Sequence, residues 1–189
     1  DKGKIPGDGL VAGYGTIMGN LTVGNGGVVS PGSSNAISYL TVTKGITLGQ
    51  GSTTLMKLNA FSGSADHFDG ATNVAFGGTL QLTNLFGSLG NGSAFKLFDA
   101  AHFTGAFAAL SPASPGGGLR WNTNQLNVDG TLRVFSVPAP APTFTGASHS
   151  GGGIQMSASG GIPYDPCYLL TSTNMAAPLA EWTPCATNH

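Results

Sequence analysis

Short apolar runs broken by turn-forming residues constrain the fold of this chain more than any other feature. From Thr16 to Phe135, β-branched, aromatic and leucine residues recur in runs of three to five, and nearly every run ends at Gly, Asn, Asp or Pro. Runs of this kind are typical of β-strands joined by tight turns, and helix signals are almost absent. The sequence therefore predicts an all-β chain with short strands.

The expected strands share a β-branched or aromatic centre and a turn residue at each boundary. They span residues 16–18, 21–23, 28–30, 39–42, 46–48, 53–58, 67–68, 73–76, 79–83, 94–98, 119–122, 125–128 and 131–135. The last three are expected to form hairpins that turn at Asn122-Thr123-Asn124 and at Asp129-Gly130, a strong hairpin signal. These hairpins would cap an exposed strand edge.

The segment 15–42, GTIMGNLTVGNGGVVSPGSSNAISYLTV, contains the triplet Leu-Thr-Val twice. Its glycines and asparagines tolerate the tight backbone of a corner, so that successive triplets can stack rung upon rung. This pattern predicts a β-solenoid with a repeat of roughly 19 to 25 residues. The residues expected to fill its interior are apolar: Ile17, Leu21, Val23 and Val28.

Three segments are expected along the chain. Residues 1–135 form the β-solenoid region with its hairpin cap. Residues 136–143, SVPAPAPT, form a Pro-Ala linker, because alternating proline stiffens the backbone toward an extended conformation. Residues 144–189 form a small β-sandwich segment, with Tyr168 and Trp182 supplying most of its core.

Charge is scarce, and this bears on partners and location. Only 8% of the 189 residues are charged, against about 25% in an ordinary soluble domain, and the formal net charge is −1. Such a surface suits a secreted, packed or polymerising protein and offers no basic field for nucleic acid. No apolar run is long enough for a transmembrane helix, so no membrane insertion is expected. Residues 1–4 introduce no signal peptide, which indicates a processed start or a fragment.

Cys167 and Cys185 both lie near the end of the chain. Their spacing matches no metal site, because two further ligands would be needed. We expect a disulfide between neighbouring strands, in an oxidising compartment, with two buried thiols as the alternative.

Residues 13–135 resemble the C-terminal end of bacterial autotransporter-associated β-strand repeat proteins. The matching pieces are GTIMGNLTVGNGGVVSPG, LTVTKGITLGQGSTTLMKL, SADHFDG, GGTLQLTN, AFKLFDAAHFTGAFAAL and LRWNTNQLNVDGTLRV. The resemblance implies a secreted or surface-exposed β-solenoid that serves as a stalk or passenger. It carries over no catalytic residue and no cofactor.

The tail, CYLLTSTNMAAPLAEWTPCATN, resembles the small fibronectin-like modules of secreted bacterial proteins. It departs from them by its cysteines and by ending at His189, where the family module continues through further strands. Four strands of a sandwich that needs about seven would leave an edge open. Either the chain is a fragment, or a neighbouring chain completes the module.

The densest ionisable cluster is Asp66-His67-Phe68-Asp69. Two carboxylates and an imidazole could bind a metal ion such as calcium or form an acid/base set. The structural interpretation is favoured: Asp66 and Asp69 form turns, and strand alternation puts His67 and Phe68 on opposite faces. We therefore assign no catalytic, metal or cofactor residue.

Two further segments carry polar groups that invite a chemical interpretation. Asp99 and His102 are expected in a surface loop, and Gly24 to Gly27, GNGG, lacks the lysine and the helix of a phosphate-binding loop. A solenoid corner explains the glycines better.

The function expected from these features is that of a non-enzymatic extracellular or cell-surface protein of a bacterium. It would be a structural or filament subunit that forms a homo-oligomer or polymer through exposed β edges. The first alternative is an adhesive passenger that binds a glycan by stacking of exposed aromatic residues: Tyr14, Tyr39, Phe61 or Trp121. The second is a carbohydrate-active β-helix enzyme that uses Asp66 or Asp69.

Overall fold

The chain is nearly all β, as the short apolar runs predict. The computed structural model describes residues 4–5, 8–138, 141–150, 153–160 and 167–188. Strands account for 56% of the structure and helices for 4%, and the strands form a β-solenoid of about four turns. The chain divides into two compact units, residues 1–137 and 138–189. The boundary lies within the predicted Pro-Ala linker.

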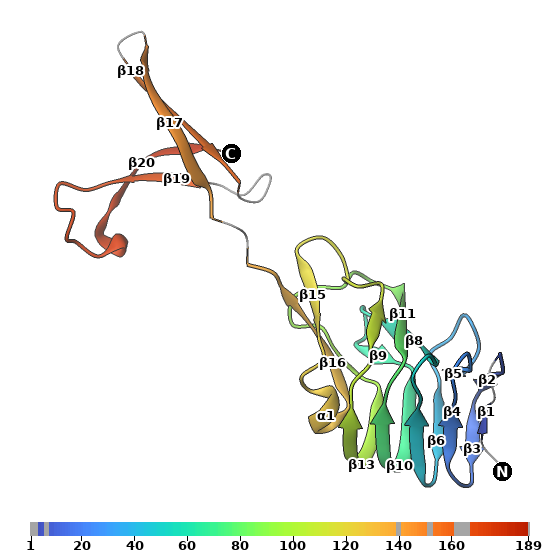
Figure 1. Cartoon of the computed structure of the whole chain (residues 1–189). Helices are drawn as coiled ribbons and strands as arrows, with labels where there is room; N and C mark the ends of the chain where they lie inside the picture. Colours follow the sequence, from blue (N-terminus) through green and yellow to red (C-terminus); the bar gives the residue numbers. More distant parts are fainter. Residues whose placement is uncertain (1–3, 6–7, 139–140, 151–152, 161–166, 189) are drawn as a thin grey trace. The chain divides into compact units, whose positions relative to one another are not determined.

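The first unit is built on two parallel sheets, which we call sheet A and sheet B (Figure 1). Sheet A contains seven strands: β1 (Lys4–Ile5), β3 (Gly15–Ile17), β4 (Leu21–Val23), β6 (Tyr39–Val42), β7 (Gly45–Leu48), β10 (His67–Phe76) and β13 (Phe98–Gly105). Sheet B contains six: β2 (Leu10–Gly13), β5 (Val28–Pro31), β8 (Thr53–Asn59), β9 (Ser64–Ala65), β11 (Thr79–Phe86) and β14 (Ala109–Ser111). Only β9 is antiparallel to its neighbour.

Each coil of the solenoid crosses both sheets. The first coil is β1–β2–β3 and the second β4–β5–β6, while the third runs from β7 through β8 into the first half of β10. Ladder partners from Leu21 onward are 25 to 30 positions apart, as in Leu21 with Ile46 and Phe68 with Phe98. The predicted repeat of 19 to 25 residues includes the spacing of 25 at the second coil but is too short for the later coils, to which β9 and β12 add residues.

The duplicated Leu-Thr-Val triplets do not stack on each other. Residues 21–23 in β4 pair with residues 46–48 in β7, and residues 40–42 in β6 pair with residues 15–17 in β3. The two triplets therefore begin and end the same coil. Their likeness arises because both strands lie in sheet A and each buries a Leu and a Val against the same interior.

β10 is longer than the sequence indicates and links two coils. Its first residues pair with β6 and its last residues with β7, so one strand replaces two expected strands at 67–68 and 73–76. Gly70 stands at the bend between them with φ of 75°, a left-handed value that favours glycine. Asp69 is consequently an internal strand residue rather than a turn former.

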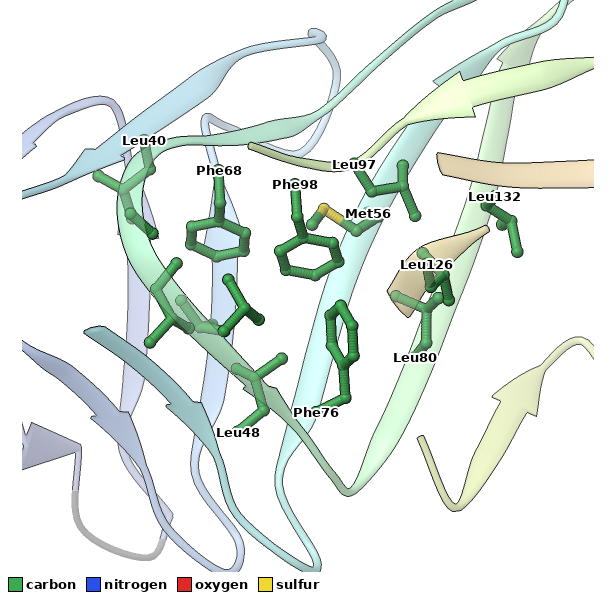
Figure 2. Close-up of a cluster of buried hydrophobic side chains, with 14 of the residues drawn as sticks. Leu40, Leu48, Met56, Phe68, Phe76, Leu80, Leu97, Phe98, Leu126 and Leu132 are labelled. Atoms are coloured by element: carbon green, nitrogen blue, oxygen red, sulfur yellow. The ribbon is translucent and has the colours of Figure 1, made fainter. Parts of the chain in front are cut away.

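The interior of the solenoid is apolar and well filled. Leu21 and Val23 are buried as predicted and Ile17 packs against the core, but Val29 rather than Val28 points inward in β5. Figure 2 shows Phe68 and Phe98 side by side, with Phe76 turned across them. The ring centroids of Phe68 and Phe98 are 5.5 Å apart and stacked, and those of Phe76 and Phe98 are 5.0 Å apart and edge to face. Such pairs add to the free energy of area burial.

A small antiparallel sheet lies beyond the last complete coil and covers its apolar end (Figure 1). It consists of β12 (Ala94–Lys96), β16 (Thr131–Ser136) and β15 (Leu119–Asn122), and it is joined by the helix α1 (Leu126–Asp129). Leu126 and Leu132 are buried in the common core. The cap is thus present, but the strand predicted at 125–128 is wrong: Gly130 ends a helical turn there in the left-handed conformation.

One corner of the solenoid repeats a glycine on successive coils. A Cβ added at Gly49 would lie 2.8 Å from the Val23 carbonyl oxygen, and one at Gly77 would lie 2.3 Å from that of Leu48. The backbone of each coil therefore rests directly on the preceding one, with no room for a side chain. We call this repeat, which Gly105 continues above Phe76, the glycine ladder.

The second unit contains two separate hairpins. β17 (Thr143–Ser150) pairs with β18 (Gly153–Ser159), and β19 (Cys167–Thr171) pairs with β20 (Thr183–Asn188), with the 3₁₀ turn η1 (Leu179–Glu181) between the last two. None of its side chains that the structure describes is buried. Trp182 is half-buried, and the side chain of Tyr168 lies outside the described residues. The described residues therefore form two two-stranded sheets and lack the buried core that was expected of a sandwich.

The predicted Cys167–Cys185 disulfide is not formed in this structure. Cys185 has a free, exposed thiol, and the register pairs Cys167 with Asn188, three positions further along β20. That offset corresponds to about 10 Å along a strand, whereas bridged Cα atoms lie within about 7 Å. The correction follows from the register, which the spacing of the cysteines in the sequence does not reveal.

Candidate functional site

A buried ion pair lies beside sheet B. Lys57 is 5% exposed and Asp66 is fully buried, and Lys57 Nζ lies 2.5 Å from Asp66 Oδ2. The same ammonium donates a hydrogen bond of 2.9 Å to the carbonyl oxygen of Pro31. Asp66 is therefore neither the turn former nor the metal ligand considered from the sequence, because its buried carboxylate is paired with the Lys57 ammonium.

The pair occupies the point where β8 changes partners. The first residues of β8 pair with parallel β5, and its last residues pair with antiparallel β9. Between them, Asp66 Oδ2 accepts a hydrogen bond of 2.9 Å from the Lys57 amide, and Asp66 Oδ1 accepts one of 2.9 Å from the Ser38 amide. The carboxylate thus accepts hydrogen bonds from the Lys57 and Ser38 amides, which no ladder pairs. Buried backbone N–H groups need such a partner.

Two opposing effects act on the Asp66 carboxyl. Burial raises the pKa of Asp66, whereas the hydrogen bonds from Lys57 and from the Ser38 amide act against that rise. A charged pair removed from water is held together only when both partners are present and hydrogen-bonded. We conclude that Lys57 and Asp66 hold the loop 32–38 and β9 onto β8.

His67 and Asp69 follow Asp66 but face the outside of sheet A. Phe68 between them is buried, so the predicted alternation of His67 and Phe68 is confirmed. His67 Nε2 lies 4.0 Å from Asp69 Oδ1, and His67 Nδ1 lies 3.3 Å from the Lys96 carbonyl oxygen. Both side chains line an open depression of about 360 Å³ together with Ile37, Ser38, Tyr39 and Ala65.

The ladder register arranges polar and aromatic residues around this depression in two rows. Tyr39 pairs with His67. Tyr14 is the single residue between β2 and β3, and it immediately precedes Gly15, whose ladder partner Leu40 immediately follows Tyr39. Thr16 pairs with Thr41, which in turn pairs with Asp69. We call these six residues the sheet A patch: Tyr14, Tyr39, His67, Thr16, Thr41 and Asp69.

The other aromatic residues considered for stacking lie apart from this patch. Phe61 is 88% exposed in the turn between β8 and β9. Trp121 is half-buried against the core, and its indole Nε1 donates a hydrogen bond of 2.9 Å to the Pro112 carbonyl oxygen. Of the four residues named from the sequence, Tyr14 and Tyr39 directly precede ladder partners, Gly15 and Leu40.

The remaining candidates have structural positions. Asp99 and His102 lie in β13 rather than in a loop, and Asp99 pairs with Lys96 at 3.3 Å. Residues 24–27 form the corner between β4 and β5, where the Gly26 amide donates to the Gly51 carbonyl. Over the described ranges, no three His, Cys, Asp or Glu side chains gather as metal ligands would.

Comparisons with protein-family models, with curated proteins and with solved structures give no match to this chain. The relation to autotransporter-associated repeats and to fibronectin-like modules therefore remains a prediction. In the part of the chain that the structure describes, no helix is long and apolar enough to cross a membrane.

Sequence reasoning missed Lys57, the partner that determines the state of Asp66. A signal for it exists: TTLMKL places one charged residue inside an otherwise uncharged strand. Because Lys is almost never fully buried without a partner, such a residue calls for a nearby carboxylate. Asp66 follows nine positions later, across a turn rich in Gly and Ser.

Proposed function

We propose that this chain is a non-enzymatic structural protein of the bacterial cell surface or extracellular space, whose copies associate through exposed β edges. The observation that supports this most is the difference between the two ends of the solenoid. At the C-terminal end, α1 packs on β13, and the sheet of β12, β15 and β16 covers the core, although β13 and β14 each pair with one described strand only. At the N-terminal end β1, β2 and β3 also each pair with one strand only, and no such cap covers them among the described residues. Uncovered strand edges favour pairing with another chain.

Apolar groups accompany the open backbone of the first coil. Val11 pairs with buried Val29 and is itself 36% exposed, and Leu10 and Met18 are 63% and 88% exposed. Covering such a surface would remove apolar area from water and contribute favourably to association.

The partner expected at this coil is a second copy of the chain. The open edges belong to both sheets, because β1 and β3 lie in sheet A and β2 lies in sheet B. A partner that pairs with all of them must have strands arranged in the same two sheets, as the first coil of a second copy does. Since the cap of β12, β15, β16 and α1 covers the core at the other end of each copy, we expect two open coils to meet head to head about a twofold axis. Longer filaments would then use the edges of the hairpins β17–β18 and β19–β20, each of which has only two strands.

The acidic residues do not support an enzyme. Hydrolysis of glycosides needs two carboxyl groups that face one substrate. Asp66 is buried with its oxygens occupied, which leaves Asp69 beside His67 on the surface. A structural role therefore fits the chemistry of this cluster better than catalysis.

A proline on the open edge tests the proposal. The Gly9 carbonyl oxygen accepts a hydrogen bond from the Val28 amide, so alternation along β2 turns the Ala12 amide away from β5. Ala12→Pro removes this donor without breaking a ladder bond of the monomer. Ala12→Val keeps the donor and serves as the control.

Sedimentation velocity over a range of concentrations, with electron microscopy of the same samples, gives the readout. We expect the wild type and Ala12→Val to associate as concentration rises and Ala12→Pro to remain monomeric. A wild type that stays monomeric throughout, or an Ala12→Pro variant that associates as the wild type does, would overturn the proposal.

A further inference from the structure

We propose that the sheet A patch binds an extended, uncharged oligosaccharide of equatorially substituted pyranose rings. This inference concerns the outer face of sheet A rather than a strand edge. Tyr14 and Thr16 lie at the open coil, whereas Tyr39, Thr41, His67 and Asp69 lie on β6 and β10, which are paired on both sides. It rests on three observations: adjacent exposed tyrosines, a parallel row of hydrogen-bonding groups, and a backbone that is held in place.

The aromatic row supplies the stacking surface. Tyr14 is 83% exposed and Tyr39 is 62% exposed, although tyrosines of a solenoid could equally fill its core. Each immediately precedes one member of the ladder pair Gly15 and Leu40, and neighbouring strands are spaced by about 4.8 Å. A pyranose with equatorial substituents presents a flat face of C–H groups, which packs on an aromatic ring while the phenolic hydroxyls remain free for hydrogen bonds.

The polar row lies beside the aromatic one. Thr16 and Thr41 each offer a hydroxyl, which both donates and accepts, and Asp69 offers two acceptor oxygens with a side chain 49% exposed. His67 closes the aromatic row and adds a ring nitrogen 4.0 Å from Asp69. Sugar hydroxyls at the edge of a stacked ring need this mixture of donors and acceptors.

The patch is connected to the buried ion pair through Ser38 and Asp66. The Ser38 amide, directly before Tyr39, is bound to Asp66 Oδ1, and His67 directly follows Asp66 in the chain. Tyr39 therefore stands on a strand fixed at its first residue, between paired neighbours on both sides. A surface that is ordered before binding loses less conformational entropy when a ligand settles on it.

The same pairing argues for a glycan rather than a peptide. A peptide strand binds by adding to a free sheet edge, but four of the six patch residues lie on β6 and β10, which have partners on both sides. Among the described strands of the patch, only β3, which contributes Thr16, has a free edge. The patch contains no Lys or Arg to attract a polyanionic chain. Recognition must therefore come from side chains that stack and hydrogen-bond, which is the chemistry of neutral sugar rings.

Isothermal titration calorimetry of the full chain with cellohexaose and chitohexaose tests the proposal, with maltohexaose as a curved comparison. We expect binding of at least one extended probe, weakened about tenfold by Tyr39→Ala and less by Tyr14→Ala. Phe61→Ala, an equally exposed aromatic residue outside the patch, is the matched control and should bind as the wild type does.

Circular dichroism and thermal melting of each variant separate lost binding from lost folding. No heat of binding with either extended probe would overturn the proposal. So would binding that Tyr39→Ala leaves unchanged in a folded variant, or affinity for maltohexaose equal to that for the extended probes.

Discussion

The two units of this chain have similar amino-acid composition, but in the part that the structure describes only the strands of the first unit surround a buried hydrophobic core. Both consist of short strands, few charges and many Gly, Ser and Thr residues. In residues 4–137, strands from successive coils surround a core that includes Phe68, Phe95 and Phe98, all fully buried. In the described part of residues 138–188, the two hairpins bury no side chain, and Phe144 is 59% exposed.

The difference teaches that strand pairing alone does not make a core. In the solenoid, ladder partners are up to 30 positions apart, so every coil sets its apolar residues on those of the coil before. In the second unit each strand pairs with the next along the chain, and a two-stranded hairpin is marginally stable by itself. Three substitutions, each with a matched control, test this comparison.

The largest effect is expected from Phe98→Ala. Phe98 contacts Phe68 and Phe76 at the centre of the solenoid, and its removal leaves a cavity that costs about 4 kcal/mol of unfolding free energy. Phe144→Ala in β17 is the matched change in the second unit and should cost less than about 0.5 kcal/mol. Urea denaturation of both variants measures the difference, and equal losses would contradict the contrast between the units.

A smaller loss is expected from Asp66→Ala. The substitution leaves the Lys57 ammonium and the Ser38 amide without their buried acceptor, at a cost of about 3 kcal/mol. Asp99→Ala breaks only the exposed pair with Lys96 and should cost no more than about 0.5 kcal/mol. The same denaturation assay applies, and an Asp66→Ala variant as stable as Asp99→Ala would show that the ion pair does not hold β9 in place.

The smallest of the three is expected from Gly77→Ala in the glycine ladder. Its Cβ would approach the Leu48 carbonyl oxygen to 2.3 Å, so the coils must separate locally, at about 2 kcal/mol. Gly117→Ala, where nothing lies within 4 Å, should be close to neutral. Thermal melting compares the two, and a neutral Gly77→Ala would mean that the corner yields more easily than its contacts indicate.

The sequence predicts the local features well because they depend on local chemistry. Short apolar runs and glycine corners indicate the solenoid, and period-two alternation separates His67 from Phe68. The features that were missed depend on residues distant in the chain. The register of β19 and β20 parts Cys167 from Cys185, and the burial of Asp66 depends on Lys57 across a turn.

Of the candidate site, the residue types were predictable but their grouping was not. Tyr14 and Tyr39 are 25 positions apart, and only the ladder of β3 and β6 places the residues that follow them side by side. Asp69 joins them because β10 continues through Gly70, where a turn was expected. The spacing of Gly49, Gly77 and Gly105 in the glycine ladder is nearer to the observed spacing of ladder partners in the later coils than the predicted repeat is.

The glycine ladder also distinguishes two sides of the solenoid, one where the coils are in close backbone contact and one where the connections vary in length. Where Gly49, Gly77 and Gly105 rest on the coil before, an inserted residue or side chain would force the coils apart. On the other side, the connection from sheet B to sheet A lengthens along the chain. It is Tyr14 alone between β2 and β3, and it includes all of β12 between β11 and β13. New sequence can therefore accumulate along that one side, next to the sheet A patch, while the stacking of the coils stays unchanged.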